Sequence, residues 1–131
     1  MATYTAKPNN DPVMMFTMAL LHSVTTTHIC HWKTESYSQH IALAEYYDGV
    51  SDLLDSFVEA FQGKYGVLTK FTSGYEPPNS EPTVLYLIEL RNMVESFRAM
   101  TNFPTDTELQ NLVDEIVSLL DSTIFKLQRL K

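Results

Sequence analysis

Cysteine is almost absent from this sequence of 131 residues, in which Cys30 is the only one. A single cysteine cannot form a disulfide within its own chain, and this usage is typical of proteins that fold in a reducing compartment. We interpret Cys30 as a small hydrophobic core residue. The sequence also lacks a signal peptide and an uninterrupted apolar run of about 18 residues, the length of a membrane span. We therefore expect a cytoplasmic protein without a membrane-spanning segment.

Basic residues are scarce, with 9 lysines and arginines against 16 aspartates and glutamates and a formal net charge of −7. A protein that binds a phosphate backbone needs clustered lysine and arginine side chains, so the charge balance argues against nucleic acid as a partner. The sequence also contains no Gly-rich phosphate loop, no Gly-x-Ser-x-Gly turn and no Cys-x-x-Cys pair. These absences leave histidines and carboxylates as the candidates for chemistry.

Glycine and proline are few, at 4 and 6 residues, and most of them separate four segments in which apolar residues recur at helical spacing. No segment alternates as a strand would. The length is that of one domain, covering residues 1–131. We predict helices over residues 11–33, 37–63, 81–102 and 105–130.

Capping signals mark the ends of these helices. Asp11 precedes a proline and can cap the first helix, and Ser36 with Gln39 forms a capping box for the second. Gly63 and Gly66 are predicted to end the second helix. The remaining predicted caps are Ser80 for the third helix and Thr105 with Glu108 for the fourth.

Four helices without a strand predict an all-α four-helix bundle. The connection between the second and third helices, residues 64–80, is long enough to cross the bundle from one end to the other. The first and last connections are short, so we expect each of those helix pairs to be antiparallel.

Four candidate metal ligands lie within residues 31–59. His31 and His40 flank the first predicted turn, whereas Asp55 and Glu59 lie one helical turn apart on one face of the second helix. Imidazole nitrogen and carboxylate oxygen are ligands that iron and zinc accept. However, the stretch of helix from His40 to Asp55 spans about 22 Å, at a rise of ~1.5 Å per residue. One chain therefore cannot bring the four side chains to one ion.

Antiparallel pairing of the second helix with its copy in a second subunit would solve this problem. His31 and His40 of one subunit would then meet Asp55 and Glu59 of the other, and a two-fold interface would hold two such sites. The helical phase agrees, because the two carboxylates lie on the side away from the apolar stripe. That face is covered either by water or by a partner.

The same stretch resembles the ferroxidase segment of the Dps family, the miniferritins. The resemblance rests on the pair His31-Trp32 at the end of the first helix, on His40 at the start of the second, and on Asp55-x3-Glu59. Small ferritin-like proteins of tailed bacteriophages are similar in this pattern. The turn after Trp32 is shorter here than in the Dps family, and the lysine-rich tail that many members use to bind DNA is missing.

The resemblance implies a ferritin-like four-helix bundle with a long crossover between the second and third helices. It implies that His31, His40, Asp55 and Glu59 bind Fe2+ between two-fold-related subunits, where H2O2 or O2 oxidises it for iron sequestration or oxidative protection. Iron is the expected metal, with zinc or another divalent ion as the alternative. The expected assembly is at least a homodimer through the second helix, with a larger shell as the alternative. The candidate accessory residues are His28, Asp48 and Asp52, with Trp32 close to the metal.

A second interpretation of the same residues needs no metal. A ferritin-like helical module could use its acidic face to bind another protein, leaving the metal site empty, because a fold does not fix a function. His28, one turn before His31, then packs in the turn, and Trp32 is a core residue. Metal titration separates the two interpretations.

Overall fold

The computed structural model of the protein describes residues 11–71 and 82–130. Over these residues the chain forms four α-helices and no strand, as the sequence predicts. The helices are α1 (Pro12–Lys33), α2 (Tyr37–Tyr65), α3 (Thr83–Arg98) and α4 (Thr107–Arg129).

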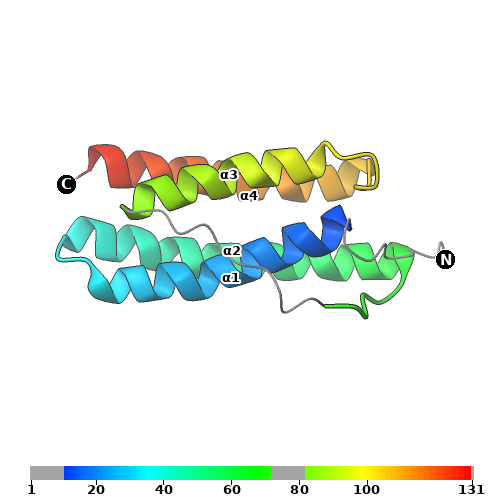
Figure 1. Cartoon of the computed structure of the whole chain (residues 1–131), viewed down its shortest axis with the longest axis horizontal. Helices are drawn as coiled ribbons and strands as arrows, with labels where there is room; N and C mark the ends of the chain where they lie inside the picture. Colours follow the sequence, from blue (N-terminus) through cyan, green and yellow to red (C-terminus); the bar gives the residue numbers. More distant parts are fainter. Residues whose placement is uncertain (1–10, 72–81, 131) are drawn as a thin grey trace.

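The helices form a bundle of two layers, with α1 and α2 antiparallel in one layer and α3 and α4 antiparallel in the other (Figure 1). Contacts join α1 to α2, α2 to α4, α4 to α3 and α3 to α1, so that α2 and α3 occupy diagonal corners. Figure 1 shows α2 and α3 running in the same direction, so the end of α2 and the start of α3 lie at opposite ends of the bundle. The predicted crossover falls on the segment between them, of which residues 72–81 lie outside the described part of the chain.

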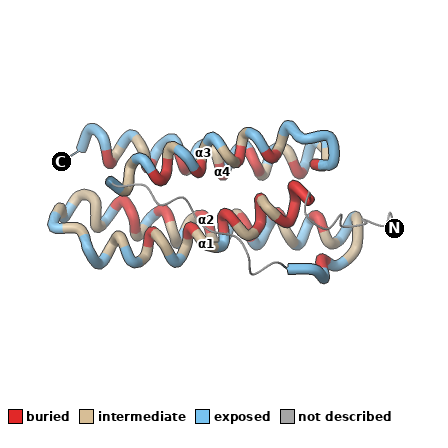
Figure 2. The backbone as a smooth tube through the Cα atoms, viewed as in Figure 1, coloured by how far each residue is buried: buried red, intermediate tan, exposed pale blue. Residues whose placement is uncertain are grey.

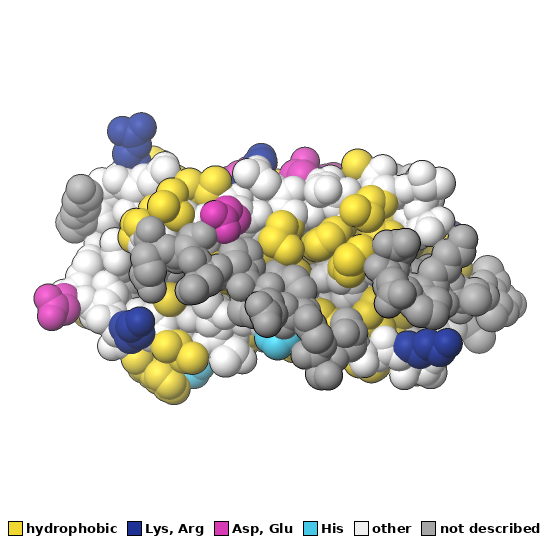
Figure 3. All heavy atoms as spheres, in the orientation of Figure 1, with side chains coloured by type: hydrophobic (Ala, Val, Ile, Leu, Met, Phe, Trp, Pro, Cys, Tyr) yellow, Lys and Arg dark blue, Asp and Glu magenta, His cyan; other side chains and the backbone are white. Residues whose placement is uncertain are grey.

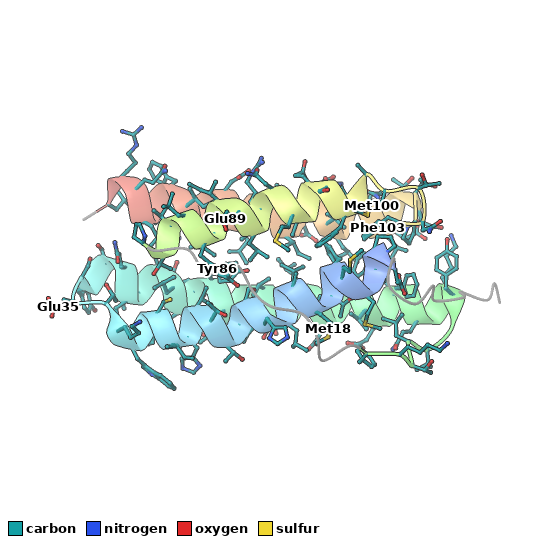
Figure 4. All side chains as sticks on the ribbon, in the orientation of Figure 1. Met18, Glu35, Tyr86, Glu89, Met100 and Phe103 are labelled. Atoms are coloured by element: carbon teal, nitrogen blue, oxygen red, sulfur yellow. The ribbon has the colours of Figure 1, made fainter. Side chains whose placement is uncertain are left out.

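The core lies between the two layers, on the sides of the helices that face one another (Figure 2). Phe16 of α1 and Phe57 of α2 pack at 4.7 Å between ring centroids, and Phe103 from the α3–α4 connection lies 5.3 Å from Phe16. Tyr86 of α3 points into the same interior (Figure 4) and is 2% exposed. Each such side chain contributes about 1.5–3 kcal/mol on burial.

A buried hydrogen-bond chain joins α1 to α2. The Ser23 hydroxyl donates to the carbonyl of Leu20 over 2.6 Å. Ser23 has only this one proton, so the Tyr46 hydroxyl, 2.8 Å away, is the donor in the second bond. Burial raises the pKa of Tyr46, although the bond to Ser23 acts in the opposite direction.

Gly49 lies where α2 approaches α4 closely. A Cβ built on Gly49 would lie 3.1 Å from Cδ2 of Leu119, which is tighter than ordinary van der Waals contact. A glycine inside a helix costs about 1 kcal/mol relative to alanine. Close packing of the two helices accounts for a glycine at this position.

Two of the predicted caps are present. Asp11 accepts hydrogen bonds from two backbone amides in the first turn of α1. Ser36 accepts from the backbone amide of Gln39 over 3.3 Å, which confirms half of the predicted capping box. The other half is wrong, because the Gln39 side chain accepts from the Thr34 hydroxyl instead of returning to the cap.

The predicted end of α2 is two residues too early. Gly63 does not stop the helix, which continues to Tyr65 and ends at Gly66, where φ is +101°. A glycine ends a helix readily when its own backbone is left-handed, a conformation that other residues adopt at a cost. The sequence contains both glycines but does not say which one takes that conformation.

The predicted limits of α3 and α4 also need correction. Helix α3 ends at Arg98 instead of residue 102, and its predicted cap, Ser80, lies outside the described residues. Helix α4 starts at Thr107 with Asp106 at the cap position, so the capping box predicted at Thr105 is wrong. The Asp106 carboxylate accepts hydrogen bonds from Lys64 and Tyr65 at the end of α2. These bonds, with that from Lys64 the larger cause, lower the pKa of Asp106.

Helix α1 is long and apolar enough, by length and composition, to cross a membrane. The helix contains no uninterrupted apolar run of that length, because polar residues such as His22 interrupt the apolar ones. Half of its apolar window is buried inside the bundle, and core helices of soluble proteins pass the same test.

Candidate functional site

The α1–α2 turn brings His31 and His40 into direct contact. Their rings stack with centroids 3.6 Å apart and an angle of 18° between the planes. Each ring also hydrogen-bonds to the other residue's backbone: Nδ1 of His31 lies 2.6 Å from the carbonyl oxygen of His40, and Nδ1 of His40 lies 2.9 Å from that of His31. The two histidines therefore join the end of α1 to the start of α2 through a reciprocal pair of hydrogen bonds.

These two hydrogen bonds determine which ring nitrogen of each histidine can bind a metal ion. A carbonyl oxygen only accepts, so each Nδ1 must carry a proton, and the neutral ring then has its free lone pair on Nε2. Histidine metal ligands commonly have this arrangement, with one nitrogen bonded to a backbone carbonyl and the other to the metal. The imidazoles of His31 and His40 therefore fit a metal through Nε2.

The stacking adds a geometric condition. The lone pair of a ring nitrogen lies in the plane of its ring, and the planes of two stacked rings that differ by 18°, with centroids 3.6 Å apart, do not meet at a single nearby ion. The rings of His31 and His40 can therefore serve two different ions, or one ion after one ring turns out of the stack. Iron and zinc are compatible with imidazole ligands in either case.

A third imidazole and two aromatic rings extend the cluster. His28 stacks on Tyr47 at 4.3 Å between centroids and lies 4.4 Å from Trp32. Tyr47 also meets His31 edge-on at 5.5 Å. His28 is thus packed between aromatic rings. The Tyr47 ring, in contact with the edge of His31, limits rotation of the His31 ring.

An apolar patch lies on the outer surface beside the turn. Hydrophobic side chains gather beside a histidine at this end of the molecule (Figure 3). Trp32 is 68% exposed and Tyr37 is 78% exposed, and Ile29 and Ile41 are also exposed. The interpretation of Trp32 as a core residue is therefore wrong.

The opposite half of the predicted site is an acidic face on α2, formed by Asp48, Asp52, Asp55 and Glu59. All four are exposed. None of them belongs to a salt bridge among the described residues, whereas carboxylates on other faces do. Glu45, for example, pairs with Lys126 of α4 over 2.8 Å. The acidic face therefore presents carboxylates that no described cation neutralises.

Within one chain the two halves stay apart. His31 and His40 meet at the turn, while Asp55 and Glu59 share a face further along α2, with Asp55 about 22 Å from His40 at ~1.5 Å per residue. Across residues 11–71 and 82–130, no group of three or more His, Cys, Asp or Glu side chains is arranged to hold a metal ion. The pairing of two chains that would join the halves stays a prediction.

It was not predicted from the sequence that the rings of Tyr47 and Tyr37 lie beside the histidines. Tyr47 lies seven residues after His40, which is two helical turns and nearly the same direction, so helical phase alone could have placed it beside the histidines. The exposure of Tyr37 follows from the same phase, since it shares a side of α2 with Ile41. Cys30, predicted to be buried, is partly exposed and packs against the core.

Comparison with known protein families finds a match over most of the chain. A family model described as a family of unknown function (DUF5856) matches residues 31–127. No curated protein and no solved structure matches the chain. The matched region starts at His31 and contains all four predicted ligands, but the description of the family names neither ferritins nor an activity.

Proposed function

The chain belongs to DUF5856, a family of unknown function, and from its own residues we propose that it binds and oxidises Fe2+ at a site shared by two subunits. The ligands are His31 and His40 of one subunit with Asp55 and Glu59 of the other. Because the two rings are stacked, they would bind either two neighbouring ions, or one ion after the His40 ring turns out of the stack. The observation that carries the proposal is the reciprocal hydrogen bonding of the two imidazoles, which holds both rings with Nε2 as the free ligand atom.

The acidic face of α2 supplies the second half of the donor set. Asp55 and Glu59 are exposed on one side of a helix, and neither has a cationic partner among the described residues. Carboxylate oxygens favour Fe3+ over Fe2+, because they are hard anionic donors. Fe2+ is the substrate, and one electron passes from each ion to hydrogen peroxide or dioxygen. Asp48 and Asp52 raise the local concentration of the cation.

The scaffold of this proposal is a ferritin-like bundle. Its helices would be connected by a crossover through residues 66–82, which would join the end of α2 to the start of α3 at the other end of the molecule. The parallel course of α2 and α3 supports this connection (Figure 1). The resemblance of residues 31–59 to the Dps family supports it as well, and the assembly would be at least a homodimer through α2.

Replacing both carboxylates tests the proposal directly. We expect Asp55→Ala with Glu59→Ala to abolish oxidation of Fe2+ by peroxide, because half of the donor set is lost. The fold should be retained, since both side chains are exposed and alanine favours helix. The measurement is the rate of Fe3+ formation, with circular dichroism to confirm the helix content.

Glu89→Ala with Glu115→Ala is the matched control, because it removes the same charge from exposed positions on α3 and α4. This control should oxidise Fe2+ at the rate of the unmodified protein. Equal rates for the Asp55/Glu59 variant and the unmodified protein would contradict the proposal.

A second candidate function is a non-enzymatic module for protein–protein interaction. The exposed Trp32, Tyr37, Ile29 and Ile41 favour it, because a contiguous apolar patch on a soluble protein commonly marks an interface. Anaerobic titration with Fe2+ or Zn2+ in a calorimeter separates the two functions. Two equivalent sites per dimer support the ferroxidase, whereas the absence of binding leaves the interaction module.

A further inference from the structure

We propose that two copies of this chain pair through the α1–α2 surface only when a divalent cation neutralises the carboxylates at the centre of that interface. This inference rests on the proposed function, because it uses the same pairing of two subunits. It adds a regulatory property: the protein would be a monomer without metal and a dimer with it.

The two ends of the surface are complementary to each other. The turn end carries the imidazoles, the apolar patch of Ile29, Trp32, Tyr37 and Ile41, and Lys33, which is exposed and has no salt bridge among the described residues. The far end carries Asp55 and Glu59. Antiparallel pairing around a two-fold axis lays the turn end of each copy on the acidic end of the other. A second copy of the chain is therefore the partner that fits this surface.

The same pairing places like charges together at its centre. If His40 of one copy lies level with the midpoint between Asp55 and Glu59 of the other, then Asp48 lies within about one residue, ~1.5 Å along the axis, of Asp48 in its copy. Asp52 then lies level with Glu45 of the other copy. Glu45 is already bonded to Lys126, whereas Asp48 and Asp52 have no described cation beside them.

Removal of these carboxylates from water without a counter-charge opposes association. Like charges that face each other across an interface cost free energy and suppress pairing. The apolar patch at each turn supplies attraction, but the centre repels until cations bind to the carboxylates. Binding of metal and binding of the second copy therefore favour each other by the same factor, as linkage requires.

Sedimentation of the full chain with Zn2+ tests the inference, since Zn2+ binds the same ligand types and is not oxidised. We expect a monomer in EDTA and a dimer with Zn2+. The dissociation constant of the dimer should be lower in Zn2+ than in EDTA by about tenfold or more.

Neutralising the centre should make the metal unnecessary. Asp48→Asn with Asp52→Asn leaves all four proposed ligands in place, and we expect this variant to dimerise in EDTA. Glu89→Gln with Glu115→Gln is the matched control, because it removes two exposed charges from other helices. This control should stay monomeric in EDTA.

The outcomes also separate this inference from the proposed function. A dimer of the unmodified protein in EDTA at low salt would overturn the inference and leave the ferroxidase site standing if Zn2+ still binds. A monomer in EDTA that binds no Zn2+ in the calorimeter would overturn both. The Asp48/Asp52 variant could also stay monomeric in EDTA while the unmodified protein forms a dimer with Zn2+. That result would assign the metal dependence to the four ligands alone and overturn the role of the carboxylates at the centre.

Discussion

At the scale of single residues, Tyr46 shows how burial and one hydrogen bond set a side chain's chemistry. Its ring is fully buried, and its hydroxyl donates to Ser23 in the core. Burial disfavours the phenolate and raises the pKa of Tyr46 above the ordinary value of 10.0. A group whose pKa is raised on folding contributes stability that is complete below its unfolded pKa. That contribution is lost as the pH rises beyond this value.

We therefore expect Tyr46→Phe to have opposite consequences at neutral and alkaline pH. Near pH 7 the variant should be less stable by about 1 kcal/mol, because a buried hydrogen bond is lost. Above pH ~10 the unmodified protein should lose up to about 1.4 kcal/mol per pH unit that the variant does not lose. The two unfolding free energies should converge and cross. Urea unfolding between pH 7 and 11.5 measures this.

Tyr37→Phe is the control for this prediction, since Tyr37 is exposed on the surface. It should leave both the neutral stability and the alkaline slope unchanged. A constant difference between Tyr46→Phe and the unmodified protein across the pH range would contradict the account of Tyr46.

The candidate site shows which residue properties a sequence carries. The spacing of His31 and His40 around a short turn was enough to predict that they approach each other, because a short connection between antiparallel helices keeps the residues on its two sides close together. The reciprocal bonds to backbone carbonyls could not be predicted, because they depend on ring rotation and on the exact path of the turn. Trp32 was misassigned for a similar reason: a large hydrophobic residue near a helix end is compatible with burial and with exposure.

At the scale of helices, the two glycines at the end of α2 have different roles. Gly63 lies within the helix, and a Cβ added there meets nothing within 4 Å. Gly66 ends the helix with φ at +101°, a conformation that side chains with a Cβ rarely adopt. The same substitution should therefore have opposite effects at the two positions.

We expect Gly63→Ala to stabilise the protein by about 0.5–1 kcal/mol, because alanine has the higher helix propensity. We expect Gly66→Ala to destabilise it by about 1 kcal/mol or more, because a left-handed backbone is strained with a Cβ. Thermal unfolding of the two variants beside the unmodified protein measures both. Equal shifts in the same direction would mean that α2 does not end where the structure places its end.

The start of a helix was predictable where a side chain interacts locally, as at Asp11 and Ser36. The start of α4 was not, because the carboxylate at its cap position, Asp106, is drawn to Lys64 and Tyr65 of another helix. A capping signal is a local property of the sequence. A contact between α2 and the α3–α4 connection is a tertiary property that overrides it.

At the scale of the whole molecule, the four-helix architecture could be predicted because every helix carries an apolar stripe that must be buried. Helix α4 has the most regular stripe, and the side opposite it is polar. The dimer could not be predicted with the same force. An acidic face such as Asp48–Glu59 has the same sequence pattern whether water or a second copy covers it. Helical spacing predicts only that one chain cannot bring all four proposed ligands to one metal ion.

Thermal stability provides a test of whether the metal site spans two chains. A ligand that binds only the folded state raises the melting temperature by mass action. If Zn2+ binds between subunits, the rise at a fixed free Zn2+ concentration should grow with protein concentration, because each bound ion requires two chains. If Zn2+ binds within one chain, for example at a single imidazole of the α1–α2 turn, the rise should not depend on protein concentration. Scanning calorimetry over a tenfold range of protein concentration distinguishes the two, and Asp55→Ala with Glu59→Ala should remove only the concentration-dependent rise.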